Sequence, residues 1–121
     1  MDIQRYHQTF KNWHSAAVTY GGLIFLSGVV ADDKLLPLKQ QAEQVFAKID
    51  RTLAERGSSK ARLLSVTIYL ADLGKKEEMN EVWKAWVDHE NLPARTCVGA
   101  VLTPNTQIEV TVCAAGTPPA A

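Results

Sequence analysis

The chain has 121 residues, and its 13 basic side chains balance its 13 acidic ones, giving a formal net charge of zero. One domain spanning residues 1–121 is expected at this length, and the balanced charge disfavours nucleic acid as an obligate partner. No apolar run approaches the roughly 20 residues of a membrane span, and no basic segment followed by an apolar run opens the sequence. We therefore expect a cytoplasmic protein with no membrane partner.

The first half of the chain predicts strands followed by a helix. Two short strands are expected in residues 15–28 around Gly21-Gly22, because a glycine pair accepts the positive φ values of a tight hairpin turn. An edge strand is expected within residues 3–9, and residues 29–37 are typical of a loop. The apolar residues of 38–56 recur at helical spacing, which predicts a helix capped by the following glycine.

The second half predicts a strand at 62–70, a helix at 76–89 that stops before Pro93, and strands at 95–102 and 107–114. The turn TPNT between the last two strands predicts that they pair as an antiparallel hairpin. This order of elements predicts an α+β fold, with a mainly antiparallel sheet and two helices packed on one face.

Two helices leave the other face of such a sheet open. If that face met water, apolar and polar residues would alternate along its strands. The segments LIFLSG and VTIYLA do not alternate, which predicts burial on both faces. We therefore expect the open face to pack against other copies of the chain in a closed oligomer.

Arg95 heads an otherwise apolar or small segment, ARTCVGAVL, and its permanently charged guanidinium suits planar anions such as carboxylates. In the last two strands the odd-numbered positions would share a polar face that carries Arg95, Cys97, Glu109 and Cys113. The predicted hairpin separates Arg95 and Glu109 by four to six positions, well over ~10 Å. They would serve one site only if a neighbouring copy brought them together.

Several motifs resemble the reactive-intermediate-deaminase family, also called Rid or YjgF-like, along almost the whole chain. The matching segments are LSG (26–28), QA (41–42), TIYLAD (67–72), MNEVW (79–83), PARTCV (93–98) and IEV (108–110). The resemblance implies a chorismate-mutase-like fold that assembles as a homotrimer with clefts between subunits.

The resemblance also implies hydrolysis of reactive 2-imino or enamino acids to 2-keto acids and ammonia, with no metal or organic cofactor. By this likeness Arg95 would clamp the substrate carboxylate and Glu109 would orient or activate the attacking water. Backbone groups around Cys97 would hold the imine nitrogen or the carboxylate, and Ser27 and Asn80 would line the cleft.

One position departs from the family pattern. The archetypal deaminases carry a tyrosine thirteen residues before the hairpin serine, where this chain has His14. The chain is therefore more similar to a divergent, YoaB-like branch. His14 either replaces the tyrosine as a hydrogen-bonding group in the cleft or is unrelated to it.

Structural interpretations compete with each functional one. Arg95 alone is also compatible with a solvated strand end and Glu109 with a polar strand edge, whereas packing is favoured over nucleophilic chemistry for Cys97 and Cys113. The three histidines are scattered without metal-ligand spacing, so no metal is predicted.

Two classes of function follow from these residues. The first is a deaminase, and the alternative is a non-catalytic module that binds a small carboxylate such as a keto acid. Ribonuclease or holdase behaviour, also associated with the family, is weaker because the chain has no excess of basic residues.

Overall fold

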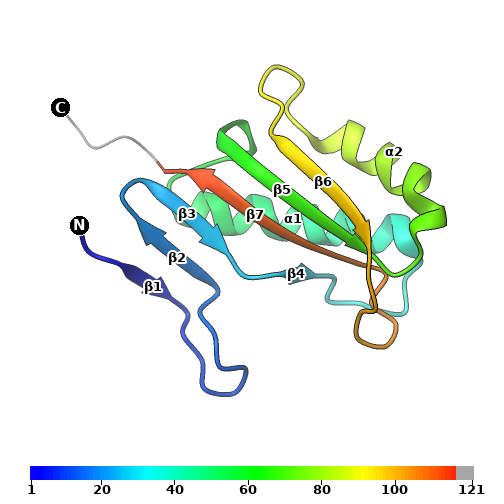
Figure 1. Cartoon of the computed structure of the whole chain (residues 1–121), viewed down its shortest axis with the longest axis horizontal. Helices are drawn as coiled ribbons and strands as arrows, with labels where there is room; N and C mark the ends of the chain where they lie inside the picture. The colour runs from blue at the N-terminus through cyan, green and yellow to red at the C-terminus, as the bar shows by residue number, and fades with distance from the viewer. Residues whose placement is uncertain (117–121) are drawn as a thin grey trace.

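A computed structural model of the chain describes residues 1–116, in which seven strands form one mixed sheet accompanied by two helices (Figure 1). The predicted α+β class is confirmed. The strands are β1 (Gln4–Tyr6), β2 (Ala17–Tyr20), β3 (Leu23–Leu26), β4 (Val29–Val30), β5 (Leu63–Leu70), β6 (Ala94–Gly99) and β7 (Ile108–Ala115), and the helices are α1 (Leu38–Glu55) and α2 (Lys76–Trp86). Within residues 1–116, no helix is both long and apolar enough to cross a membrane.

The N-terminal strands form as predicted. The β2–β3 hairpin turns at Gly21 and Gly22, whose φ values of 57° and 84° lie in the left-handed region that glycine adopts without strain. The predicted edge strand is β1, which pairs antiparallel with β2. The loop predicted for residues 29–37 is wrong at Val29 and Val30, because these two residues pair with β7 as β4.

Helix α1 is the predicted first helix, and Gly57 follows it with a φ of 71°. Helix α2 ends at Trp86 and not at the predicted His89, because Val87 turns into an extended conformation and buries its side chain in the core. The Asp88 carboxylate then accepts the backbone N–H of Glu90, which stabilises a turn in place of a further helical turn.

The predicted hairpin between the last two strands is wrong. Strand β5 lies between them: it pairs parallel with β6 and antiparallel with β7. The chain leaves β6 at Gly99 and passes around the end of β5, where Ala100 N–H donates to Leu70 O and Ala71 N–H to Gln107 O. The turn at 103–106 does form, with Asn105 at a φ of 67°, but it belongs to this crossover.

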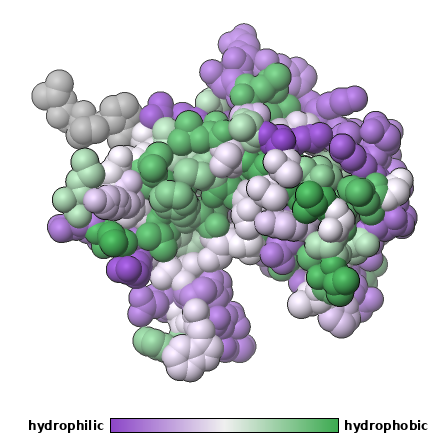
Figure 2. All heavy atoms as spheres, viewed as in Figure 1, coloured by the Kyte–Doolittle hydropathy of each residue, from purple (hydrophilic) through white to green (hydrophobic). Residues whose placement is uncertain are grey.

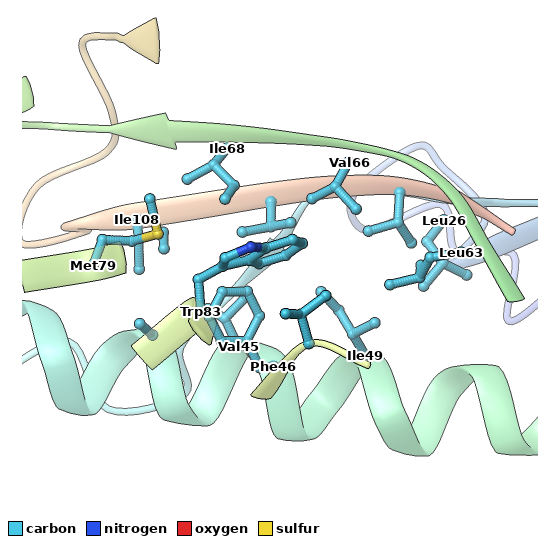
Figure 3. Close-up of a cluster of buried hydrophobic side chains, with 14 of the residues drawn as sticks. Leu26, Val45, Phe46, Ile49, Leu63, Val66, Ile68, Met79, Trp83 and Ile108 are labelled. Carbon is cyan, nitrogen blue, oxygen red and sulfur yellow. The ribbon is translucent and has the colours of Figure 1, made fainter. Parts of the chain in front are cut away.

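The core lies between the sheet and the helices (Figure 3). Side chains from α1, α2 and the inner face of the sheet meet there, and Trp83 lies among them with its ring against Phe46. On β5 the inner residues are Val66, Ile68 and Leu70, all at most 1% exposed. Aromatic and branched side chains of this size dominate the stability of such a layer.

The opposite face of the sheet carries exposed apolar side chains. Figure 2 shows them gathered over the middle of the sheet, and they include Tyr20, Leu23, Phe25, Leu64 and Val98, each between 38% and 46% exposed. An apolar area of this kind on a sheet face is typical of a surface that another protein covers.

Gln41 is a fully buried amide that ties three segments together. Its Nε2 donates to the carbonyls of Leu36 and Asn105, at 2.9 Å each, and lies 3.3 Å from that of Lys34; its Oε1 accepts the backbone N–H of Gln107. The amide therefore holds the loop before α1 against the crossover that leads into β7.

We expect Gln41→Ala to lower the free energy of unfolding by about 3 kcal/mol, because it leaves buried backbone groups without partners. Chemical denaturation measures the loss. Gln40→Ala, at the exposed neighbouring position, is the matched control and should change stability by no more than about 0.5 kcal/mol. Equal effects of the two substitutions would contradict a role for the Gln41 amide.

Candidate functional site

Arg95 lies at the start of β6 and faces the helix side of the sheet. Its Nη1 donates to Asn80 Oδ1 on α2 at 2.8 Å, and its guanidinium carbon lies 5.2 Å from the centre of the Trp83 ring. Neither contact neutralises its charge, and within residues 1–116 no acidic side chain forms an ion pair with it. We call Asn80, Trp83 and Arg95 the arginine group.

A hollow of about 550 Å³ adjoins the arginine group. Its eight lining residues include no acid: they are Asn80, Trp83, Lys84, Val87, His89, Leu92, Pro93 and Arg95. Two cations therefore face a mainly apolar cavity whose volume falls in the range of small-molecule pockets. The arrangement suits an organic anion, because Asn80 orients the guanidinium and leaves its other N–H groups able to donate.

His14 and Ser27 lie together at the other side of the molecule. The Ser27 hydroxyl donates to Ser15 O at 2.6 Å, and its oxygen lies 3.2 Å from His14 Nδ1. With the proton on Nδ1, the imidazole donates to Ser27 and leaves Nε2 as an acceptor. Both residues line a hollow of about 370 Å³ that extends to Lys48 on α1.

The Glu109 carboxylate lies against Gly28, beside the same hollow. A Cβ added to Gly28 would stand 2.6 Å from Glu109 Oε2, so the missing side chain makes room for this carboxylate. Gly28 also lines the hollow that contains His14 and Ser27. We call His14, Ser27, Gly28 and Glu109 the glutamate group.

The structure separates the arginine group from the glutamate group. Arg95 is in register with Val66, and Glu109 with Tyr69, on either side of β5, so their Cα atoms are roughly 14 Å apart. Residues in register point to the same face, so Arg95 shares the helix face with Val66 while Glu109 shares the open face with Tyr69. The predicted common face for the odd-numbered positions is therefore wrong for β6.

The two cysteines also lie on opposite faces. Cys97 is in register with Ile68 and packs against the core, whereas Cys113 is in register with Phe25 on the open face. Burial raises the pKa of the Cys113 thiol, which lowers its thiolate fraction and its nucleophilicity. Strand β6 forms the edge of the sheet, so alternate backbone groups near Cys97 face away from β5 and can meet a ligand.

No group of three His, Cys, Asp or Glu side chains is placed to hold a metal ion in the part of the chain that the structure describes. The polar groups gathered at the two hollows are a guanidinium, amides, a hydroxyl, an imidazole and a carboxylate. Each of these groups can donate or accept hydrogen bonds, so they are chemically suited to a small polar molecule.

Sequence reasoning missed the residues that shape the site. The ring of Trp83 packs in the core and also supports Arg95, and the sequence alone assigned no role to the apolar residues Val87 and Leu92. Leu92 gives a weak signal, as a leucine directly before Pro93 in the loop between α2 and β6. Gly28 gives no signal in the sequence, because only the structure shows that its lack of a side chain leaves room for Glu109.

The loop before His14 presents two exposed aromatic rings that were also not anticipated. Phe10 and Trp13 are 69% and 79% exposed and meet edge to face with their centroids 5.5 Å apart. Trp13 has a φ of 56°, an uncommon conformation for a bulky residue. The loop therefore carries an apolar surface next to the glutamate group.

The fold and the two groups define a small α+β domain that offers a guanidinium at one hollow and a carboxylate beside another. The family model described as Endoribonuclease L-PSP matches residues 6–116. The chain thus belongs to this family, the Rid or YjgF-like proteins.

Similar proteins span nearly the same length. A RutC family protein of Haemophilus ducreyi is 36% identical over 105 residues, covering 86% of this chain and 90% of the relative. The RutC family protein YoaB of Escherichia coli is 36% identical over 77 residues, covering 63% of this chain and 68% of YoaB. A YjgF family member from Neisseria meningitidis has a solved structure with a TM-score of 0.90 and 43% identity, and each chain covers 98% of the other.

We expect Asn80→Asp to weaken the binding of benzoate or 2-oxobutyrate at least about tenfold, because the new carboxylate would occupy the Arg95 guanidinium. Titration calorimetry measures the affinity. Asn91→Asp adds the same charge at an exposed position on the loop before β6 and should have little effect. Binding by Asn80→Asp as tight as that of the unaltered chain would argue against Arg95 as the carboxylate-binding group.

Proposed function

We propose that the chain hydrolyses 2-imino and enamino acids to 2-keto acids and ammonia, at clefts between the subunits of a homotrimer. The observation that carries the proposal is the charge of Arg95. The Arg95 guanidinium contacts an amide and an indole ring and lacks an acidic partner within residues 1–116. It faces a hollow that has no acid in its lining. The family to which the chain belongs adds support, since imine deamination is associated with it.

Assembly would bring the arginine group of one copy to the glutamate group of the next. Head-to-tail contacts of this kind close into a ring when the rotation between copies divides the circle evenly. The exposed apolar residues of the open sheet face, together with Phe10 and Trp13, supply surface for such contacts. Each copy would then contribute to two clefts, one through Arg95 and one through Glu109.

The reaction would proceed by addition of water to the C=N bond. Arg95 would hold the substrate carboxylate by two parallel N–H donors, and Glu109 of the neighbouring copy would accept a proton from water as its oxygen attacks the imine carbon. Transfer of that proton to nitrogen would give the carbinolamine. Its hydroxyl proton would then move to the amine as the C–N bond breaks, which releases ammonia and leaves the ketone. Ser27 and His14 would hydrogen-bond the nitrogen or the water. The substrate is already reactive, so orientation supplies much of the acceleration.

A second candidate is a module that binds keto acids without turnover, through the same arginine group. The observation that favours it is His14, which stands where the family pattern has tyrosine and whose Nδ1 lies 3.2 Å from the Ser27 hydroxyl oxygen. Saturable keto-acid binding without accelerated imine loss would favour this module over the deaminase.

We expect Arg95→Lys to reduce kcat/KM about a hundredfold, since lysine cannot make the paired contact with a carboxylate. Imines generated by an amino-acid oxidase, with the unreacted part trapped by semicarbazide, provide the assay. Arg51→Lys on the exposed face of α1 is the matched control. If Arg95→Lys keeps full activity, the assignment of Arg95 is wrong.

We expect Glu109→Gln to reduce kcat by about 100-fold or more, because the amide cannot accept the proton of the attacking water. Glu43→Gln, at an exposed position of α1, should retain full activity. A Glu109→Gln enzyme that works at the normal rate would remove the proposed general base.

Mixing two inactive variants tests whether the site lies between copies. Arg95→Ala and Glu109→Gln, refolded together in equal amounts, would form some clefts with both residues intact. Random assembly predicts about a quarter of the wild-type activity. If both residues act within one copy, the mixture stays inactive.

A further inference from the structure

We propose that the hollow beside Arg95 selects 2-imino acids with bulky apolar side chains, and that Leu92 is a specificity-determining residue of this pocket. The inference rests on the proposed function, because it identifies the substrate class of the same site. It comes from the distribution of polar and apolar groups around one cavity on one copy of the chain.

Two of the four polar residues that line the hollow belong to the arginine group, and the other two are Lys84 and His89. Asn80 and Arg95 join there through a 2.8 Å hydrogen bond, and Lys84 follows Trp83 on the same helix. A carboxylate bound to Arg95 would therefore be anchored at one side of the cavity. The rest of the substrate would extend past the Trp83 ring.

Apart from His89, the remaining walls are apolar. They consist of Trp83, Val87, Leu92 and Pro93, which come from the end of α2 and the loop that leads into β6. Trp83 and Val87 are already 8% and 7% exposed, so a leucine- or phenylalanine-derived side chain would remove from water mainly the exposed surface of Leu92, at about 25 cal/mol for each Å². An alanine-derived imine is too small to cover this apolar surface and would leave it exposed to water.

The charge of the lining excludes a second class of substrates. Lys84 and Arg95 are both cations, and none of the eight lining residues is acidic. The side chain of a lysine- or arginine-derived imine would therefore enter a hollow of like charge without a partner. We expect such imines to be poor substrates.

Leu92 is the most exposed apolar wall of the hollow, with 69% of its surface accessible. The loop that carries it is held in place, because His89 Nε2 lies 2.6 Å from Lys84 O and Asn91 N–H donates to Asp88 O. An exposed leucine at the rim of a cavity becomes more buried when a ligand enters. This makes its truncation a selective test.

The experiment compares imines derived from leucine, phenylalanine, alanine and lysine, with the wild-type chain and with Leu92→Ala. We expect wild type to prefer the leucine and phenylalanine imines to the alanine imine by at least about tenfold, and to turn over the lysine imine most slowly. Leu92→Ala should lower kcat/KM for the two bulky imines about fivefold to tenfold and leave the alanine imine within about twofold. Leu35→Ala, at a leucine that is 89% exposed outside the hollow, is the matched control.

Binding of the keto-acid products gives a second reading that does not need turnover. Calorimetry with 4-methyl-2-oxopentanoate and with pyruvate should show tighter binding of the former, and Leu92→Ala should reduce that difference at least about threefold. Thermal unfolding of each variant checks that the fold is intact.

The outcomes separate the two proposals. If imines are hydrolysed without preference for bulky side chains, or Leu92→Ala slows all of them alike, the pocket assignment is overturned while the deaminase stands. If no imine is hydrolysed, the proposed function fails, and the pocket then depends on the binding data. Selective loss of 4-methyl-2-oxopentanoate binding would support it, and equal or absent binding of both keto acids would overturn it.

Discussion

The position of β5 in the sheet is the constraint on which the rest of the structure depends. Because β5 pairs parallel with β6 on one side and antiparallel with β7 on the other, Arg95 and Glu109 lie on opposite faces and two strand spacings apart. A guanidinium and a carboxylate that met within the chain would neutralise each other. Kept apart, each retains its charge and its capacity to bind.

The surroundings of Arg95 explain how that charge is kept in a partly buried place. A buried carboxylate would satisfy the guanidinium but would also compete with any carboxylate ligand. Asn80 supplies one uncharged acceptor, and the face of Trp83 offers the weaker attraction of an aromatic quadrupole. The side chain is thus oriented without being neutralised, which is the condition a recognition group for anions must meet.

Local structure was predictable from the sequence, and the pairing of distant segments was not. Gly21-Gly22 and the apolar stripe of α1 act through neighbours in the chain, so their elements were predicted within a residue or two. The hairpin between β6 and β7 was wrong because strands adjacent in sequence need not be adjacent in a sheet, and alternation cannot say which face is inner. The candidate residues were recognisable from their motifs, but the cavity at Leu92 and the space at Gly28 exist only after long-range packing.

Within residues 1–116, the strand that joins the others is also the last in chain order. Strand β7 pairs with β3, β4 and β5, so during translation the earlier strands emerge from the ribosome with their central neighbour still missing. Until residues 108–115 are synthesised, the hairpin and β5 have unpaired edges and exposed apolar side chains. The sheet can therefore be completed only after β7 has been synthesised, and a nascent chain stalled before β7 would be prone to aggregation.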